Sequence, residues 1–294
     1  MSNYNNATFV SLGEGCCIGM VLRELKYRSN AYPFDWLINV TPKILLEAFK
    51  SEFSDMWPTK DEILKIREDQ MNDLLVQKFV KEFGLDKTPA NDAELFGGYY
   101  KKMYDKYLEN TKNIENKQNT DDILSFRDFL YRIKYRYFKG SIRGDYFFPN
   151  KYGMIMVHEL KHHYFKKNDE DKLDIYQFDD LWSKYERRVE RLKNMLESGN
   201  NDNPVVFLFA GYTSLIFPED DGEEDWNYLI ELRDFIVEKY PKLDFRIETF
   251  NVVRSSRTDK NLINHYYDWN FLKNPIKQLR INILNFMRKK YKKV

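Results

Sequence analysis

The sequence predicts an α/β protein with a mostly parallel sheet flanked by helices and a large helical insertion in the middle of the chain. Two observations predict the sheet. Residues 7–12 form a short apolar run that leads through a glycine-rich turn into a segment with helical spacing. Later, 205–209, 226–240 and 245–253 have the patterns of a strand, a helix and a strand. That order is typical of a parallel βαβ unit.

The first elements follow from local periodicity. The β-prone run 7–12 ends at Gly13, and the apolar residues of segment 16–26 recur on one helix face. The chain therefore opens with a strand, a turn and a helix.

The middle of the chain has an amphipathic helical pattern from residue 42 to about 138. The pattern is clearest in three stretches: 63–83, 95–108 and 123–137. We predict one domain spanning 1–294, in which the segment at about 42–138 forms a helical cap on the α/β core.

The second half supplies the rest of the sheet. Residues 152–160 are strand-like, 178–196 form a charged helix, and 276–291 close the chain as a helix. The continuous apolar run 205–209 is typical of a central parallel strand.

Composition excludes several classes of protein. Charged residues make up 32% of the chain and nearly cancel to +1, which argues against nucleic acid as the main partner. The two cysteines are adjacent, so we expect no disulfide and a reducing compartment. No signal peptide and no apolar run of about 18 residues stands out, so we predict a cytoplasmic protein without a membrane span.

The turn after the first strand has the chemistry of a nucleophile site. Ligands of open α/β sheets bind beyond the carboxyl ends of strands, and Ser11, Gly13 and Gly15 lie there. Cys16 follows at the expected helix start, where the helix dipole stabilises a thiolate and free N–H groups can hold an oxyanion. We predict that Cys16 is the nucleophile.

Two other interpretations of this turn stay open. A free cysteine is often a buried apolar filler, and one of Cys16 and Cys17 is expected to pack against the sheet. Gly13, Gly15 and Gly19 also loosely match a dinucleotide or S-adenosylmethionine turn, although their spacing differs from that motif. We predict no cofactor.

A cysteine nucleophile needs a base, and the chain has four histidines. His158 is the best candidate because it lies near the end of a predicted strand. His162 and His163 follow in a basic stretch, and His265 lies in an aromatic loop. No third ligand at a suitable spacing joins these histidines, so we predict no metal site.

Other side chains are candidates for orienting the base or binding the substrate. Asp35 lies between bulky aromatics, so it is expected to be partly buried and to need a partner, or to cap the following helix. Trp36 is a candidate substrate contact. Arg187 or Arg188 of the charged helix could bind an anion or pair with Asp35.

Several of these residues belong to one pattern. Ser11-Leu12-Gly13-x-x-Cys16, followed by Tyr32-Pro33-Phe34-Asp35-Trp36, resembles the signature of the putative papain-like cysteine peptidases (DUF1796). The later Val157-His158 pair and the Tyr185–Arg191 helix are also similar to that family. Ala31 stands where the family pattern has a serine.

The resemblance marks Cys16, Asp35 and His158 as site residues. It implies a hydrolase or acyltransferase in which Cys16 attacks an acyl group with His158 as base and Asp35 as the orienting carboxylate. The parallel βαβ pattern nevertheless favours a Rossmann-like layered sheet over a papain barrel. The alternative is a transferase for a glycan or nucleotide-linked donor, with phosphate bound at the Gly13–Gly19 turn. The sequence indicates neither the substrate, whether peptide, acyl or glycan-linked, nor the oligomeric state.

Overall fold

The structure is a computed structural model in which two compact units are distinguished. One comprises Met1–Pro58, Pro149–Val157 and Gln177–Val294, and the other comprises Thr59–Phe148 and His158–Tyr176. The residues that it describes are 6–13, 17–28, 30–38, 40–65, 104–105, 108–109, 145–161, 164–170, 172–198, 203–211, 222–267 and 275–291.

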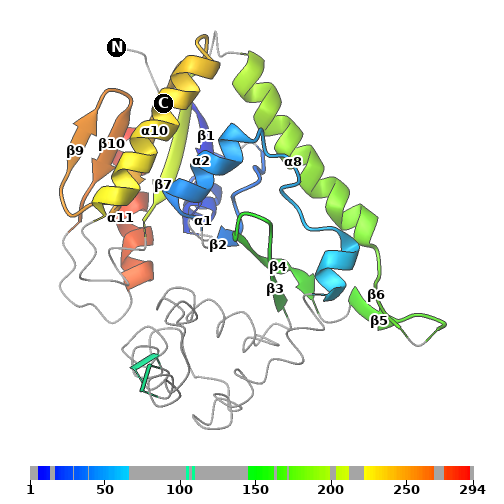
Figure 1. Cartoon of the computed structure of the whole chain (residues 1–294). Helices are drawn as coiled ribbons and strands as arrows, with labels where there is room; N and C mark the ends of the chain where they lie inside the picture. Colours follow the sequence, from blue (N-terminus) through cyan, green and yellow to red (C-terminus); the bar gives the residue numbers. More distant parts are fainter. Residues whose placement is uncertain are drawn as a thin grey trace, which may run out of the picture. The chain divides into compact units, whose positions relative to one another are not determined.

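A five-stranded sheet forms the centre of the first unit (Figure 1). Its strands, in spatial order, are β1 (Thr8–Ser11), β7 (Val205–Ala210), β8 (Phe245–Phe250), β10 (Leu262–His265) and β9 (Arg257–Asp259). All neighbouring pairs are parallel except β10 and β9, which are antiparallel. The predicted α/β class with a mostly parallel sheet is confirmed, and the three predicted strands in this sheet are β1, β7 and β8.

One face of this sheet is covered by α1 (Cys17–Glu24) and α11 (Pro275–Lys290). Because side chains alternate along a strand, Val206, Leu208 and Ala210 of β7 all face these helices. Leu279 and Ile283 of α11 complete the same apolar cluster and are fully buried. Burying each such side chain contributes about 1.5–3 kcal/mol, which makes α11 an integral part of the core.

The opposite face carries α2 (Pro42–Lys50) and α10 (Glu223–Lys239), which lie in front of the sheet in Figure 1. Phe207 of β7 packs edge to face against Phe49 of α2, with 6.4 Å between the ring centroids. Thr41 caps α2, since its hydroxyl accepts a hydrogen bond from the Ile44 amide at 3.2 Å. Proline at the first helical position suits this start.

The charged helix of the second half is α8 (Phe178–Ser198), close to its predicted bounds. Its buried side is aromatic as well as aliphatic. Trp57 packs on Tyr185 with ring centroids 4.4 Å apart, and Trp182 packs edge to face against Tyr185 at 5.8 Å. The charged residues of α8 therefore divide between a solvent side and a packed side.

Two smaller sheets accompany the main one. β2 (Leu37–Ile38), β4 (Ile155–Lys161) and β3 (Asp145–Pro149) form a sheet in the order β2-β4-β3. In the second unit, β5 (Phe165–Lys167) and β6 (Leu173–Ile175) form an antiparallel pair. β4 corresponds to the predicted strand 152–160.

The predicted helical cap lies mostly outside the described residues. Of the segment 42–138, the structure describes 42–65, which contains α2 and a helical turn at 60–65, and the short helical pieces 104–105 and 108–109. The cap and the single-domain organisation therefore stay predictions. Across the described part of the chain, no helix combines the length and the apolar character that crossing a membrane requires.

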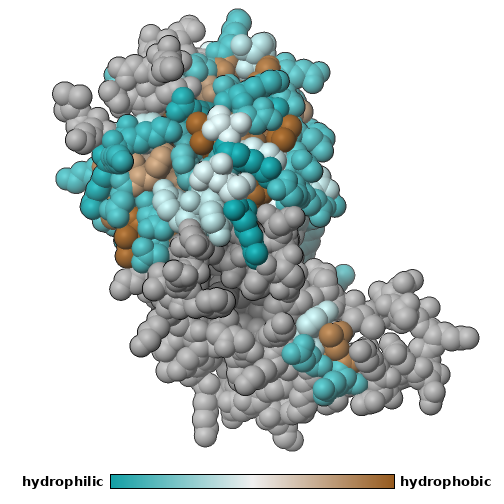
Figure 2. All heavy atoms as spheres, turned by 90° about the vertical axis from the view of Figure 1, so that its left-hand side faces the viewer, coloured by the Kyte–Doolittle hydropathy of each residue, from teal (hydrophilic) through white to brown (hydrophobic). Residues whose placement is uncertain are grey.

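The described surface is mainly hydrophilic on the face that Figure 2 shows, and its apolar side chains are scattered. Large apolar residues that are exposed in the described part of the chain are Tyr176, Val237 and Ile281. Isolated exposed apolar residues are ordinary. This face gives no reason to expect a broad apolar docking surface among the described residues.

Candidate functional site

The turn after β1 lies at the carboxyl end of the parallel sheet, as predicted. Ser11 is fully buried, and its hydroxyl accepts a hydrogen bond from the Gly13 amide at 3.3 Å. The Gly13 carbonyl accepts one from Ala210 of β7, also at 3.3 Å. These two bonds fix the path along which the chain leaves the strand.

Gly13 cannot be replaced freely at this turn. Its φ of +100° is a conformation that other residues rarely adopt, and an added Cβ would lie 2.7 Å from Cβ of Val40. The following residues, Glu14, Gly15 and Cys16, lie outside the described residues. Cys17 opens α1 and is buried in the cluster between α1, α11 and the sheet, so it is the cysteine that packs.

Asp35 is buried and holds the Tyr32–Trp36 loop together. Its Oδ2 accepts hydrogen bonds from Nη2 of Arg28 at 2.6 Å and from the Tyr32 amide at 3.0 Å. Burial raises the pKa of Asp35 above its ordinary value, although the positive charge of Arg28 opposes this shift. Arg28 also lies over the ring of Trp36, 5.5 Å from its centroid. Asp35 is therefore tied to its own loop by a nearly buried ion pair.

This loop contacts the helix that starts at the cysteine pair. A Cβ on Gly19 would lie 3.1 Å from the Asp35 carbonyl oxygen, so glycine lets α1 approach the loop closely. The two parts of the sequence signature, around residues 11–19 and 32–36, are thus packed against each other. The sequence could not show this contact, because it depends on how the loop returns to α1.

Helix α8 approaches the same loop through its arginines. The positive charge of Arg188 lowers the pKa of Asp35, against the stronger effect of burial, so the two groups are electrostatic neighbours. Arg188 itself is buried and lies over the Tyr185 ring, 4.9 Å from its centroid. Arg191 donates a hydrogen bond to the Ala31 carbonyl. Three motif segments therefore meet around Asp35: α1, the loop and α8.

The two candidate anion-binding arginines differ in their placement. Arg188 is buried and its charge acts on Asp35, whereas Arg187 is exposed and donates a hydrogen bond to Ser183 of its own helix at 3.1 Å. Arg187 is thus on the solvent side of α8. Of the two arginines, Arg188 is the one that is buried and close enough to act on Asp35.

His158 lies on β4, two residues beyond Met156. Met156 pairs with Leu37 of β2, which directly follows the Tyr32–Trp36 loop. The described residues give the backbone of His158 but not its side chain, so its role stays a prediction.

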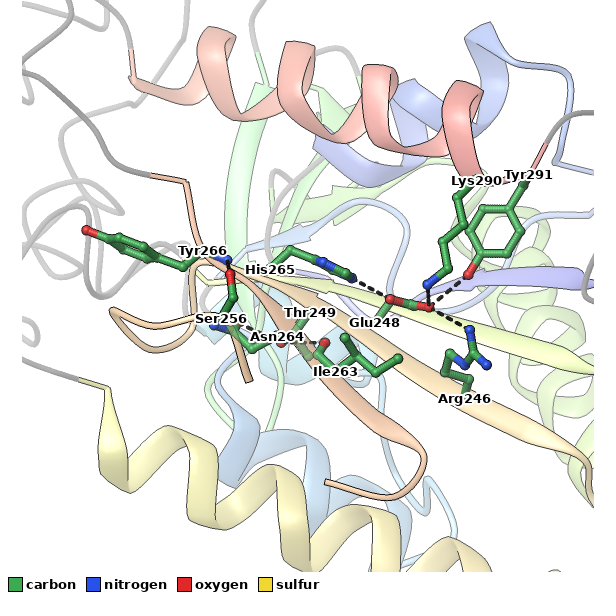
Figure 3. A network of polar contacts seen from close by, with 10 residues as sticks. All are labelled: Arg246, Glu248, Thr249, Ser256, Ile263, Asn264, His265, Tyr266, Lys290 and Tyr291. Carbon is green, nitrogen blue, oxygen red and sulfur yellow. Dashed lines mark hydrogen bonds and ion pairs between the residues drawn. The ribbon is translucent and has the colours of Figure 1, made fainter. Parts of the chain in front are cut away.

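Sequence reasoning missed a second polar cluster, centred on Glu248 in the middle of β8 (Figure 3). Its carboxylate is fully buried and contacts His265, which lies at the end of β10 rather than in a loop. One signal in the sequence could have found it. Glu248 interrupts the otherwise strand-like run from Phe245 to Phe250, and a charge in a central strand needs partners.

A neighbouring network fixes the backbone that follows β8. Asn264 of β10 donates from its amide nitrogen to the carbonyls of Val253 at 3.0 Å and Ser255 at 2.8 Å. Its amide oxygen accepts from the Thr249 hydroxyl at 2.8 Å. The carboxyl edge of the sheet is therefore rigidly organised near β8 and β10. No group of three or more potential metal ligands occurs within the residues that the structure describes.

Comparisons with known proteins bear on this arrangement. Residues 7–254 match the sequence model of a family described as putative papain-like cysteine peptidase (DUF1796). Searches of curated proteins and of solved structures gave no match. The matched range includes the β1 turn, the Asp35 loop, β4 and α8.

Proposed function

Because this chain belongs to the family of putative papain-like cysteine peptidases (DUF1796), we propose that it is a hydrolase or acyltransferase with Cys16 as its nucleophile. The observation that carries the proposal is the packing of the Asp35 loop against α1, immediately after the cysteine pair. A loop that is held by the ion pair of Arg28 and Asp35 and packs there supports the first turns of the helix. A fixed helix start is what a nucleophile and an oxyanion-binding amide both require.

The chemistry follows from the position of Cys16 before the first residue of α1. The positive end of a helix dipole favours a thiolate over a thiol. The thiolate attacks an acyl carbon and expels the leaving group, forming a thioester. Amide groups of the first helical turn would bind the oxyanion that develops on the acyl oxygen.

We further propose His158 as the base, following the family pattern. Within the first unit, Met156 of β4 pairs with Leu37, which follows the Asp35 loop, and His158 comes two residues later in the chain. Both described hydrogen bonds to Asp35 use Oδ2. We assign Asp35 to orienting the imidazole, as the family pattern does. Ser11, Gly13, Gly15, Trp36 and Arg188 would line the substrate site; Arg187 faces solvent and has no part in it.

A second candidate function is a transferase that binds the phosphate of a glycan or nucleotide-linked donor at the Gly13–Gly19 turn. The guanidinium groups of Arg28 and Arg188, both beside one carboxylate, favour it. Phosphate is recognised by this combination of arginine and free helix amides. In this case Cys16 packs and does not react.

Two measurements on the full chain distinguish the hydrolase or acyltransferase from the phosphate-binding transferase. We expect p-nitrophenyl acetate to acylate the wild type and the Cys17→Ala variant, but not the Cys16→Ala variant, as read by mass spectrometry of the intact protein. Acylation at full rate in Cys16→Ala would contradict the proposal. A thermal shift with a nucleotide sugar, but not with acetyl-coenzyme A, would support the transferase instead.

We also propose that the protein works in the cytoplasm. A reducing compartment keeps a reactive cysteine and its buried neighbour Cys17 from oxidation.

A further inference from the structure

Glu248 is a charged residue at the centre of a buried parallel sheet. It pairs with Leu208 on one side and with Ile263 on the other, and its side chain is fully buried. Placing a carboxylate there is costly unless partners compensate it, and an apolar residue of similar size would usually be at least as stable. A role beyond packing is therefore the natural explanation of this residue.

The partners of Glu248 divide between its two oxygens (Figure 3). Oε1 accepts hydrogen bonds from Lys290 at 2.5 Å, from the Tyr291 hydroxyl at 2.9 Å and from Arg246 at 3.3 Å. Oε2 lies 2.5 Å from Nε2 of His265, and among the described residues this is its one polar contact. Oε1 thus binds two cations and a hydroxyl, and Oε2 binds the imidazole.

This contact fixes the tautomer of His265. Nε2 donates its proton to the ionised carboxylate, so the neutral ring carries its lone pair on Nδ1. The ring also packs against Phe286 and Phe250, with centroids 4.3 and 5.4 Å away. The His265 side chain is nonetheless 21% exposed. A partly exposed imidazole that is oriented by a buried carboxylate has the arrangement of a general base and its orienting group.

His265 lies at the same edge of the sheet as the β1 turn. Gly13 bonds to Ala210, Ala210 pairs with Phe250, and Phe250 pairs with His265. Three strand spacings separate β1 from β10, which puts their backbones about 14 Å apart. A molecule that lies along this edge of the sheet would approach both the β1 turn and His265.

We propose that His265 is the catalytic base for the acceptor in the second half of the reaction, and that Glu248 is its positioning residue. The inference rests on the proposed function of Cys16. Nδ1 of His265 removes a proton from water or from an acceptor hydroxyl, and that oxygen bonds to the acyl carbon of the thioester. The carbon–sulfur bond breaks, its electron pair returns to sulfur as the thiolate, and the imidazolium then gives its proton to solvent.

The test uses the full chain with p-nitrophenyl acetate and the variant His265→Gln. The amide nitrogen of glutamine can still donate to Glu248, but the side chain has no basic lone pair. We expect the initial burst of p-nitrophenolate to remain, because acylation of Cys16 is unaffected. Steady-state turnover should fall at least about 100-fold, the usual contribution of a general base. Hydroxylamine, which attacks thioesters without a base, should restore product release.

Two further variants separate positioning from folding. Glu248→Gln should also keep the burst, lose turnover and respond to hydroxylamine, since it frees the imidazole from its orienting charge. Tyr291→Phe removes a partner of Oε1 and leaves the contact between Oε2 and His265, so its turnover should fall by only a few-fold. Circular dichroism melting checks that each variant is folded, and His265→Asn provides a second substitution if His265→Gln is not.

Each outcome decides between the two proposals. Turnover of a folded His265 variant within two-fold of wild type would overturn the inference, as would a loss of the burst or a failure of hydroxylamine to restore release. In those cases acylation of Cys16 in the wild type would still support the proposed function. A wild-type chain that is never acylated at Cys16 would overturn both.

Discussion

At the scale of single residues, Asp35 shows how burial and charge oppose each other in this site. Burial raises its pKa, and the neighbouring Arg28 opposes that rise without cancelling it. The guanidinium of Arg28 lies 2.6 Å from Asp35 and therefore stabilises the ionised carboxylate. The Arg28 side chain is itself only 17% exposed. Arg28, which sequence reasoning did not single out, is as important to the loop as Asp35 itself.

The substitution Arg28→Gln should accordingly destabilise the protein by about 3 kcal/mol at pH 7, because it leaves a buried charge without its partner. A raised folded-state pKa means that protonation favours the folded state. The cost of the substitution should therefore shrink as the pH falls toward the pKa of Asp35. Urea unfolding at pH 7 and at pH 5 measures both effects.

Arg187→Gln is the matched control, because Arg187 is exposed on α8 and contacts only Ser183 among the described residues. It should change the free energy of unfolding by less than about 0.5 kcal/mol. An Arg28 variant that is as stable as this control would show that the ion pair does not hold the loop.

At the scale of secondary-structure elements, α11 is attached to the sheet by charge as well as by apolar packing. Lys290 and Tyr291 at its end both contact Glu248 of β8. Burial alone would raise the pKa of Glu248, but hydrogen bonds from His265 and Lys290 and the charge of Lys290 lower it from 4.5 to about 2. The same burial and the adjacent carboxylate raise the pKa of Tyr291. Glu248 therefore stays ionised under all ordinary conditions.

This lowered pKa predicts acid sensitivity. A carboxylate with a depressed folded-state pKa contributes stability above its unfolded pKa and loses it as the pH falls toward the folded value. The free energy of unfolding should decrease by about 3 kcal/mol between pH 4.5 and pH 2 on account of Glu248. Guanidinium unfolding across that range tests this, and Glu248→Gln should be less stable at pH 7 but show a flatter profile. Equal slopes for the two proteins would contradict the assignment.

Strong periodicity allowed the long elements to be predicted from sequence, whereas the short ones were missed. β7, β8, α8 and α11 carry clear apolar patterns over six or more residues. β2, β9 and β10 have two to four residues each, and no apolar run like that at 7–12 extends them. Their strand geometry comes from neighbouring strands, which the sequence does not specify locally.

The candidate site divides in the same way. Residue types alone predicted the glycines of the turn, a buried aspartate and an arginine on the packed side of α8. Which arginine is buried, Arg188 or Arg187, depends on how α8 is rotated about its axis. The pairing of Glu248 with His265 depends on the register between β8 and β10, in which Phe250 lies opposite His265. No local sequence pattern encodes that register.

At the scale of the whole molecule, the range of residues that matches the family model ends before the hydrophobic core does. The match ends at residue 254, whereas β9, β10 and α11 follow it and complete the main sheet and its covering layer. Leu279, Ile283 and Met287 of α11 are fully buried against β7, β8 and α1. The matched segment therefore lacks one wall of its own core.

A chain cut after Arg254 should fail to fold. Removing α11 and β10 exposes the apolar side of β7 and β8 to water, at a cost of about 1.5–3 kcal/mol for each large side chain uncovered. Such a loss exceeds the usual margin of stability of a protein of this size. Circular dichroism and limited proteolysis would show it, and a soluble truncated chain with a cooperative melting transition would contradict it.

The central claim is that Cys16 is a reactive thiolate at the start of α1 while Cys17 packs. The most direct measurement is the rate of iodoacetamide alkylation as a function of pH, with each cysteine followed by peptide mass spectrometry. Alkylation of Cys16 should titrate clearly below the ordinary thiol pKa of about 8.5, and Cys17 should react only on unfolding. Alkylation of Cys16 that titrates at or above 8.5, or that is no faster than that of Cys17, would contradict the account.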